Sequence, residues 1–143
     1  LPVVIKVPPN LDDGTPFPTT YWLSCPMYNK KIGSLESTGL IKELDSQIQN
    51  DKNLHKQWSE RQHSYEAERT LEIDEKIEIH PYGGVGGARE SIKCLHSHLA
   101  DQLATRKNIV GKIVEELIGG FDCQEPCIDD EKIEKNKAWK VEW

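Results

Sequence analysis

The sequence predicts an α+β fold that is mainly helical, with a small N-terminal β-hairpin ahead of the helices. Two patterns support this prediction: β-forming residues cluster between prolines and turn residues near the N-terminus, and apolar residues recur at spacings of three and four further along. A chain of 143 residues suits one domain with one core. Because only 36% of the residues are hydrophobic and the mean hydropathy is -0.63, we expect a small core and long solvated faces.

The hairpin is predicted from two β-rich segments that flank a turn. Residues 1–7 carry several β-branched side chains, and Pro2 marks this strand as an edge. Residues 12–16 (DDGTP) predict a turn, since aspartate bonds its own backbone and glycine tolerates positive φ. Residues 19–24 then predict a second strand that can pair with the first.

Three helices are predicted after the hairpin. Pro26 suits the first position of a short helix that ends at Gly39, and a second helix runs from Leu40 to about Asn50. A long polar helix follows over residues 51–71, which we expect to touch the core along a narrow stripe; the alternative is an arm that packs on a partner. Its apolar anchors are Leu54, Trp58, Tyr65 and Leu71.

The later chain predicts two more helices and a charged tail. Residues 71–80 fit either a helix extension or a strand, and the glycines at 83–87 then lead into a helix predicted over residues 88–105. Asn108 can cap a further helix that Gly119 ends. We expect residues 1–128 to form the single domain, and residues 129–143, which contain Trp139 and Trp143, to be a charged tail that docks on a partner.

Charge and hydropathy exclude some classes of function and favour others. The net charge of -6 argues against a general nucleic-acid binder, and no apolar run approaches the roughly 18 residues that a membrane span needs. We expect a protein partner or a larger assembly. The chain does not begin with Met, so a presequence can precede Leu1. We expect a reducing compartment, either the cytoplasm or the interior of an organelle.

Three stretches of the sequence carry a family resemblance. They are DGTPFPTTYWLSCP at residues 13–26, SLESTGLIKEL at residues 34–44 and KCLHSHLA at residues 93–100. On these motifs the chain resembles the domain-of-unknown-function 501 (DUF501) family, small proteins known mostly from bacteria, over about residues 3–128. The resemblance implies no established activity. The tail after Asp129 lies outside the resemblance.

The cysteines suggest a metal site. Cys123 and Cys127 are separated by three residues in a turn-prone loop, a spacing that lets two thiolates bind one metal ion. We expect Cys25, at a strand end, and Cys94, in the first turns of a helix, to join them and bind zinc or an iron–sulfur cluster. His98 lies four residues after Cys94 and would share its helix face. Free thiols and disulfides remain the alternatives, and they require no bound cofactor.

The glycine segment supports a second hypothesis. Backbone amides around Gly86 and Gly87, together with Arg89 and Lys93, can bind a phosphate or a carboxylate at a helix N-terminus. Cys94 would then be a reactive thiol with a lowered pKa. The leading prediction is a small, non-catalytic metal-binding accessory protein. The alternative predictions are an enzyme or anion-binding domain, and a flexible linker in place of an anion site.

Overall fold

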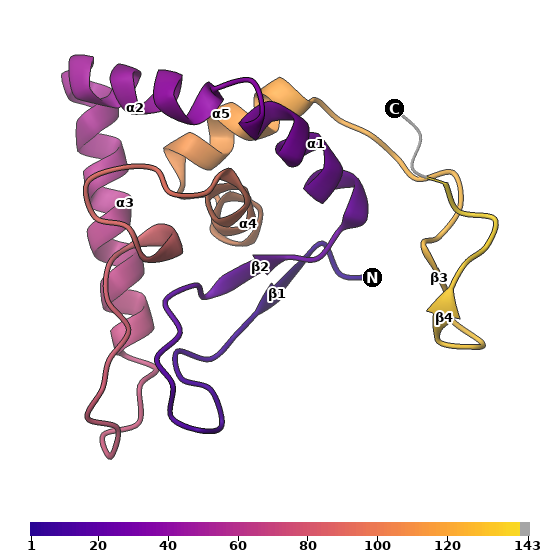
Figure 1. Ribbon diagram of the computed structural model, residues 1–143, viewed down its shortest axis with the longest axis horizontal. Coiled ribbons are helices and arrows are strands. Elements are labelled where there is room, and N and C mark those ends of the chain that lie inside the picture. The colour runs from indigo at the N-terminus through magenta and orange to yellow at the C-terminus, as the bar shows by residue number, and fades with distance from the viewer. Residues whose placement is uncertain (141–143) are drawn as a thin grey trace.

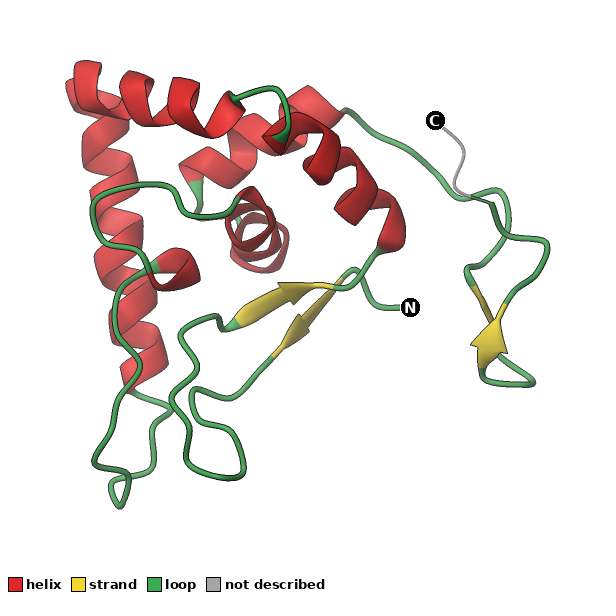
Figure 2. Cartoon of the chain, in the orientation of Figure 1, coloured by secondary structure: helices red, strands yellow, loops and turns green. Residues whose placement is uncertain are grey.

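The computed structural model, which describes residues 1–140, contains five α-helices and a short N-terminal hairpin (Figures 1 and 2). The predicted α+β class, mainly helical with one small hairpin at the N-terminus, is confirmed. No helix within the described residues is long and apolar enough to cross a membrane. Trp143 lies outside the described residues.

The hairpin pairs strand β1 (Val4–Lys6) with strand β2 (Tyr21–Leu23) in an antiparallel register. Ile5 lies opposite Trp22, so these two side chains share one face of the hairpin, and both are more than one-third exposed. The strands are shorter than predicted, but the pairing itself is confirmed. The other face of the hairpin covers the helical core, which β2 contacts through helix α4.

The first three helices begin and end at the predicted signals. Helix α1 (Pro26–Glu36) has Pro26 at its start, and Gly39 precedes helix α2 (Leu40–Asn50) with a φ of 83° that favours glycine. Helix α3 (Lys52–Thr70) is capped by Asp51, whose Oδ1 accepts hydrogen bonds from the amides of Asn53 and Leu54 at 2.9 Å each.

The chain between α3 and helix α4 (Leu95–Thr105) differs most from expectation. Residues 71–80 form neither a helix nor a strand, and the glycine segment contains one 3-10 turn, η1 (Val85–Gly87). Cys94 has an extended backbone (φ -156°, ψ 124°), and the amide of Ile92 donates to Asp45 Oδ1 at 2.8 Å. Because the Ile92 amide bonds to Asp45 and the Cys94 backbone is extended, α4 begins seven residues later than predicted.

Helix α4 is the centre of the molecule, seen nearly end-on in Figure 1 with α3, α1, α5 and the hairpin around it. It contacts α5, β2, η1, α1 and β1. Helix α5 (Ile109–Ile118) crosses it at Gly111, where an added Cβ would lie 2.2 Å from the carbonyl oxygen of His98. Asn108 caps α5 as predicted, since its side-chain oxygen accepts a hydrogen bond from the amide of Gly111.

Helix α3 packs along a narrow stripe, as expected for a solvated helix, but two arginines belong to the stripe. Trp58 and Tyr65 are buried, whereas the predicted anchor Leu71 is 87% exposed and that part of the prediction is wrong. Arg61 is buried in an ion pair with Asp101 of α4. Arg69 is buried and donates hydrogen bonds to the carbonyl oxygens of Pro18, Pro81 and Gly83 at 2.7, 3.2 and 2.7 Å.

The tail forms a second small hairpin, which stands away from the helices in Figure 1. Strands β3 (Ile128–Asp129) and β4 (Glu134–Lys135) pair in an antiparallel register. Trp139 is 8% exposed and lines a cavity together with Met27 of α1. The side chain of Trp139 is therefore buried against its own chain rather than presented to a partner.

Candidate functional site

The N-terminal end of α4 brings three possible metal ligands together. Cys94 Sγ lies 3.7 Å from His96 Nδ1, and His96 Nδ1 lies 3.3 Å from Glu36 Oε1. One donor atom from each residue lies within 4.8 Å of the other two, and all three side chains are partly buried. Glu36 is the last residue of α1, Cys94 is the residue before α4, and His96 lies in the first turn of α4.

The electrostatics of the two helix ends explain why Glu36 lies here. At the C-terminal end of its own helix a carboxylate is unfavourable, because the helix dipole is negative there. The side chain instead reaches the positive N-terminal end of α4, where its Oε1 accepts the amide of Leu95 at 2.8 Å. Glu36 therefore caps α4 from a neighbouring helix and also approaches His96.

The extended backbone at Cys94 explains how its thiol approaches His96. Within a regular helix, side chains two residues apart do not face each other. Cys94 precedes the first helical residue, so its side chain can turn toward His96. Burial alone would raise the pKa of the Cys94 thiol, but hydrogen bonds with His96 and the Ser97 amide hold that pKa below its usual value. The hydrogen bond with Cys94 and the charge of Glu36 raise the pKa of His96.

Two of the three distances between the donor atoms match those around a tetrahedral zinc ion. Zinc–sulfur and zinc–nitrogen bonds of about 2.3 and 2.05 Å at the tetrahedral angle place the two ligand atoms about 3.6 Å apart. The corresponding nitrogen–oxygen separation is about 3.3 Å. The observed separations are 3.7 and 3.3 Å. The three side chains can therefore bind a zinc ion with little movement and leave a fourth position open.

The same geometry does not suit a catalytic triad. In a triad the imidazole meets the nucleophile through one ring nitrogen and the orienting carboxylate through the other. Here Cys94 and Glu36 both approach Nδ1 of His96. A single nitrogen cannot accept the thiol proton while it donates to the carboxylate, so His96 is poorly placed as a general base for Cys94.

The other three cysteines do not join this group. Cys25 is the residue before α1, Cys123 is exposed, and Cys127 Sγ lies 3.7 Å from the amino group of Leu1. Within residues 1–140, no set of three His, Cys, Asp or Glu side chains that includes one of these cysteines converges as the Glu36 group does. All four cysteines are free, so the structure contains neither the gathered thiolates nor the disulfides that the sequence suggested.

His98 lies apart from Cys94, in the core. It is 1% exposed, and its Nδ1 lies 3.1 Å from Asn108 Oδ1, an acceptor, so Nδ1 carries the proton. Burial lowers the pKa of this imidazole. The prediction paired His98 with Cys94 because it assumed that both lie within the helix; once α4 begins at Leu95, His96 takes that place.

Three amides of the glycine segment form hydrogen bonds within the protein. The amides of Gly84 and Gly87 donate to the carbonyls of Ala88 and Gly84, and the amide of Val85 donates to Gln62 Oε1. This segment does not open a helix, contrary to the anion-site prediction, because α4 starts only at Leu95. Gly86 adopts a φ of 67° within η1.

The two cations of that prediction also do not converge on the glycines. Arg89 forms an ion pair with Glu66 at 3.0 Å and stacks over the ring of Tyr82 at 3.8 Å from the ring centroid. Lys93 is exposed, next to Cys94. The arrangement therefore favours a structural role for residues 83–87 over a phosphate site.

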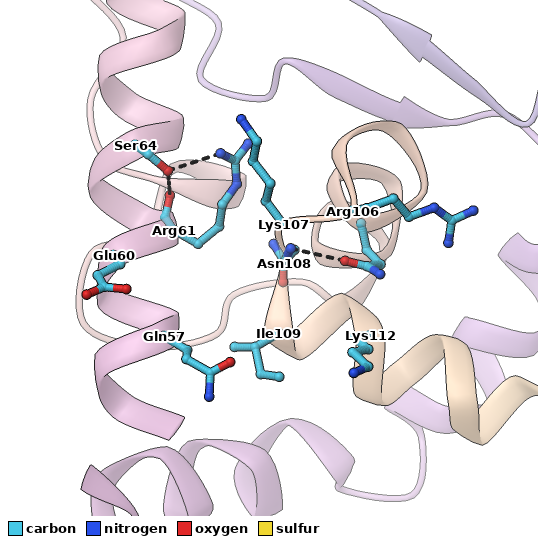
Figure 3. Close-up of a pocket in the computed structure, with 10 residues that line it drawn as sticks. Gln57, Glu60, Arg61, Ser64, Arg106, Lys107, Asn108, Ile109 and Lys112 are labelled. Carbon is cyan, nitrogen blue, oxygen red and sulfur yellow. Dashed lines mark hydrogen bonds between the residues drawn. The ribbon is translucent and has the colours of Figure 1, made fainter. Parts of the chain in front are cut away.

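A polar cavity between α3 and the α4–α5 connection is a second place where ionisable groups gather (Figure 3). Arg61 lines it, but all five of its N–H groups are used. They donate to Asp101, Glu68 and Ser64 over distances of 2.7 to 3.2 Å. Asn108, on the facing side, is bonded to Gln102 and Asp101. Because Arg61 has no N–H group left for a ligand, we interpret this cavity as part of the scaffold.

Neither Glu36 nor His96 was predicted as a site residue from the sequence. No spacing rule links Glu36 to residues near position 94, because they meet only when α1 packs against α4. A weak signal did exist: Glu36 lies in SLESTGLIKEL, and Cys94 and His96 lie in KCLHSHLA, two of the three motifs that carried the family resemblance.

Comparison with known proteins gives a family. No curated protein and no solved structure shows significant similarity to the chain. A family model described as "Protein of unknown function (DUF501)" matches residues 1–116, which include Glu36, Cys94 and His96 and stop before Cys123. The chain therefore belongs to the DUF501 family.

Proposed function

We propose that this protein binds one zinc ion through Glu36, Cys94 and His96 and acts as a small metal-binding accessory protein. The supporting observation is that three different donor atoms lie within 4.8 Å of one another, with the sulfur–nitrogen and nitrogen–oxygen separations close to those expected around zinc. A thiolate, an imidazole and a carboxylate form a donor set that suits zinc better than magnesium or calcium. An iron–sulfur cluster fits poorly, because the group offers a single thiolate.

The neighbouring residues favour metal binding over a purely structural cluster. Carboxylates that bind a metal ion are usually held by a further hydrogen bond. Glu36 accepts the amide of Leu95 and is thereby oriented before any ion arrives. The two residues on α4 come from a helix packed on several sides, so the ligands stand on a rigid element.

Three protein ligands leave one coordination position, which distinguishes this site from a four-ligand structural centre. The open position needs water or another ligand to complete the tetrahedron. The proposed role therefore combines a metal ion with a place for an exchangeable ligand. The protein partner expected from the acidic surface stays a proposal beside it.

The experiment is metal reconstitution of the purified chain, followed by elemental analysis. The protein is stripped with a chelator under reducing conditions, loaded with zinc, desalted and measured. We expect about one zinc per chain for the wild type. Cys94→Ser should lose most of the zinc, and Glu36→Gln, which keeps an oxygen to accept the Leu95 amide, should weaken zinc affinity at least tenfold to a hundredfold.

Matched controls separate this site from the four-cysteine arrangement. Cys25→Ser and Cys127→Ser change cysteines outside the group and should retain full zinc occupancy. Circular dichroism of every variant checks that the helices persist. Zinc that is absent from the wild type, or that depends on Cys25 or Cys127 as much as on Cys94, would overturn the three-ligand proposal.

A further inference from the structure

A cavity of about 440 Å³ adjoins the proposed metal site. Cys94 and His96 line it, whereas Glu36 does not. An ion held by all three residues would therefore have Glu36 on its protein side and the cavity on its other side. The open coordination position would face the cavity, and this volume falls within the range of sites for small molecules, about 300–1,000 Å³.

Part of the cavity lining is aromatic and apolar. Tyr21, Trp22 and Leu23 of β2 supply it. Trp22 is 47% exposed, a large fraction for a tryptophan, and its ring stacks on Phe17 with centroids 5.5 Å apart and an interplanar angle of 29°. Trp22 is one of the residues that line the cavity, and the stacking restricts the orientation of its exposed ring.

The remaining lining is polar but uncharged. It comes from Thr19, Asn29 and Ser97, each able to form a hydrogen bond. No Lys, Arg, Asp or Glu of residues 1–140 lines this cavity. Without lysine or arginine, the cavity offers no favourable charge interaction to a phosphate or a polyanionic ligand. Its apolar lining instead favours the burial of an uncharged ring.

We propose that this cavity is the ligand site of the metal centre and takes a small, uncharged aromatic molecule whose metal-binding group fills the open zinc position. The inference rests on the proposed zinc site. Ring contact with Trp22 supplies selectivity for aromatic over aliphatic ligands. The metal supplies the anchor at the other end of the molecule.

Cobalt-substituted protein tests the inference with benzohydroxamate and acetohydroxamate as probes. Both carry the same metal-binding group, and only the first carries a ring. Cobalt(II) reports its own coordination through its visible absorption bands. We expect both probes to change these bands, with benzohydroxamate binding at least about tenfold more tightly because its ring is buried against the aromatic wall.

Two variants locate the ring. Trp22→Ala should abolish most of the preference for benzohydroxamate and leave acetohydroxamate binding unchanged. Ile5→Ala is the matched control, since it removes an exposed apolar side chain on the same face of the hairpin but outside the cavity. This variant should keep the preference.

The outcomes distinguish the two proposals. If cobalt gives no thiolate-to-metal absorption in the wild type, the zinc site itself is refuted. If cobalt binds but both probes bind equally well, or Trp22→Ala leaves the preference intact, the metal site stands and the aromatic ligand site is refuted. A preference that is lost equally in Ile5→Ala also counts against the cavity as the binding place.

Discussion

Two polar clusters border helix α4, and they differ in the bonding capacity that they leave unused. The ion-pair cluster, made of Arg61, Glu68, Asp101 and Asn108, is nearly sealed: the side chains of Arg61 and Asp101 are 3% and 0% exposed, and every N–H of Arg61 has an acceptor. At the Glu36–Cys94–His96 site the side chains of Glu36 and His96 are 27% and 31% exposed, and three donor atoms lie within 4.8 Å of one another.

The difference separates a scaffold from a site. Buried charges that satisfy one another fix how helices pack, and they have nothing left to offer a ligand. Donor atoms that lie close together and do not saturate one another still have bonding capacity for an added ligand. Two histidines of α4 repeat the contrast, because burial lowers the pKa of His98 whereas the pKa of His96 is raised by its partners.

The largest expected effect is on stability, from Asp101→Asn. This change leaves the Arg61 guanidinium in a closed site with only Glu68, which is 41% exposed, to balance its charge. Breaking a buried ion pair from one side typically costs about 3–5 kcal/mol. We expect the free energy of unfolding of the metal-free protein, measured by urea denaturation, to fall by about that amount.

Two other variants sharpen the same comparison. Glu115→Gln breaks an exposed pair with Arg106 and should cost no more than about 1 kcal/mol. Cys94→Ser in the metal-free protein should also cost about 1 kcal/mol or less, because it changes a group whose contacts are few and partly exposed. If Cys94→Ser destabilises the apo protein as much as Asp101→Asn does, the distinction between scaffold and site fails.

A smaller loss of stability is expected from Gly111→Ala, at the crossing of α4 and α5. The added Cβ would meet the backbone oxygen of His98 at 2.2 Å, and backbone cannot move aside as a side chain can. Overpacking of this kind costs about 1–3 kcal/mol. Thermal denaturation should therefore show a lower melting temperature for this variant.

Gly33 provides the matched control for that measurement. It also lies within a helix, but an added Cβ there meets nothing within 4 Å. Gly33→Ala should stabilise the protein by about 0.5–1 kcal/mol, because alanine has the higher helix propensity. Equal effects at both glycines would show that helix propensity, and not the close crossing, governs Gly111.

The smallest effect concerns pH and His98. The pKa of His98 in the folded protein is lowered below the ordinary 6.5. Just below pH 6.5, the imidazole therefore binds a proton in the unfolded chain but stays neutral in the folded protein. The contribution of neutral His98 to stability is present above about pH 6.5 and is lost as the pH falls below it, by at most about 1.4 kcal/mol per pH unit.

Urea denaturation between pH 7.5 and 5.5 measures this slope. His98→Gln, which keeps a polar side chain at the position but cannot titrate, should flatten the slope relative to the wild type. His63, which is exposed and bonded to the Ser59 carbonyl on its own helix, gives the control His63→Gln. An unchanged slope in His98→Gln would place the pH dependence elsewhere in the molecule.

The sequence was informative wherever a local signal decides the structure. Pro26, Asp51 and Asn108 each mark a helix start by capping or by fixed φ, and the structure begins helices at all three. These signals act within a few residues and need no knowledge of the tertiary fold.

The rest depended on partners distant in the chain. Helix propensity alone extends α4 back through residues 88–94, and only Asp45, which accepts the Ile92 amide, explains why that segment stays irregular. Arg61 and Arg69 resemble solvent-facing residues until Asp101 and three loop carbonyls are placed around them. Glu36 could not be predicted as a site residue for the same reason, since its partners lie across the α1–α4 interface.

Arg69 carries a consequence for the cavity. Its guanidinium holds the Pro18 carbonyl, one residue before Thr19 at the cavity wall, and at the same time holds the irregular backbone at Pro81 and Gly83. Helix α3, which contributes none of the three proposed ligands, thus fixes the backbone that leads into β2 beside the proposed metal site. A change in the backbone at residues 81–83 would therefore shift the Arg69 side chain and, through it, the Pro18 carbonyl beside the cavity wall.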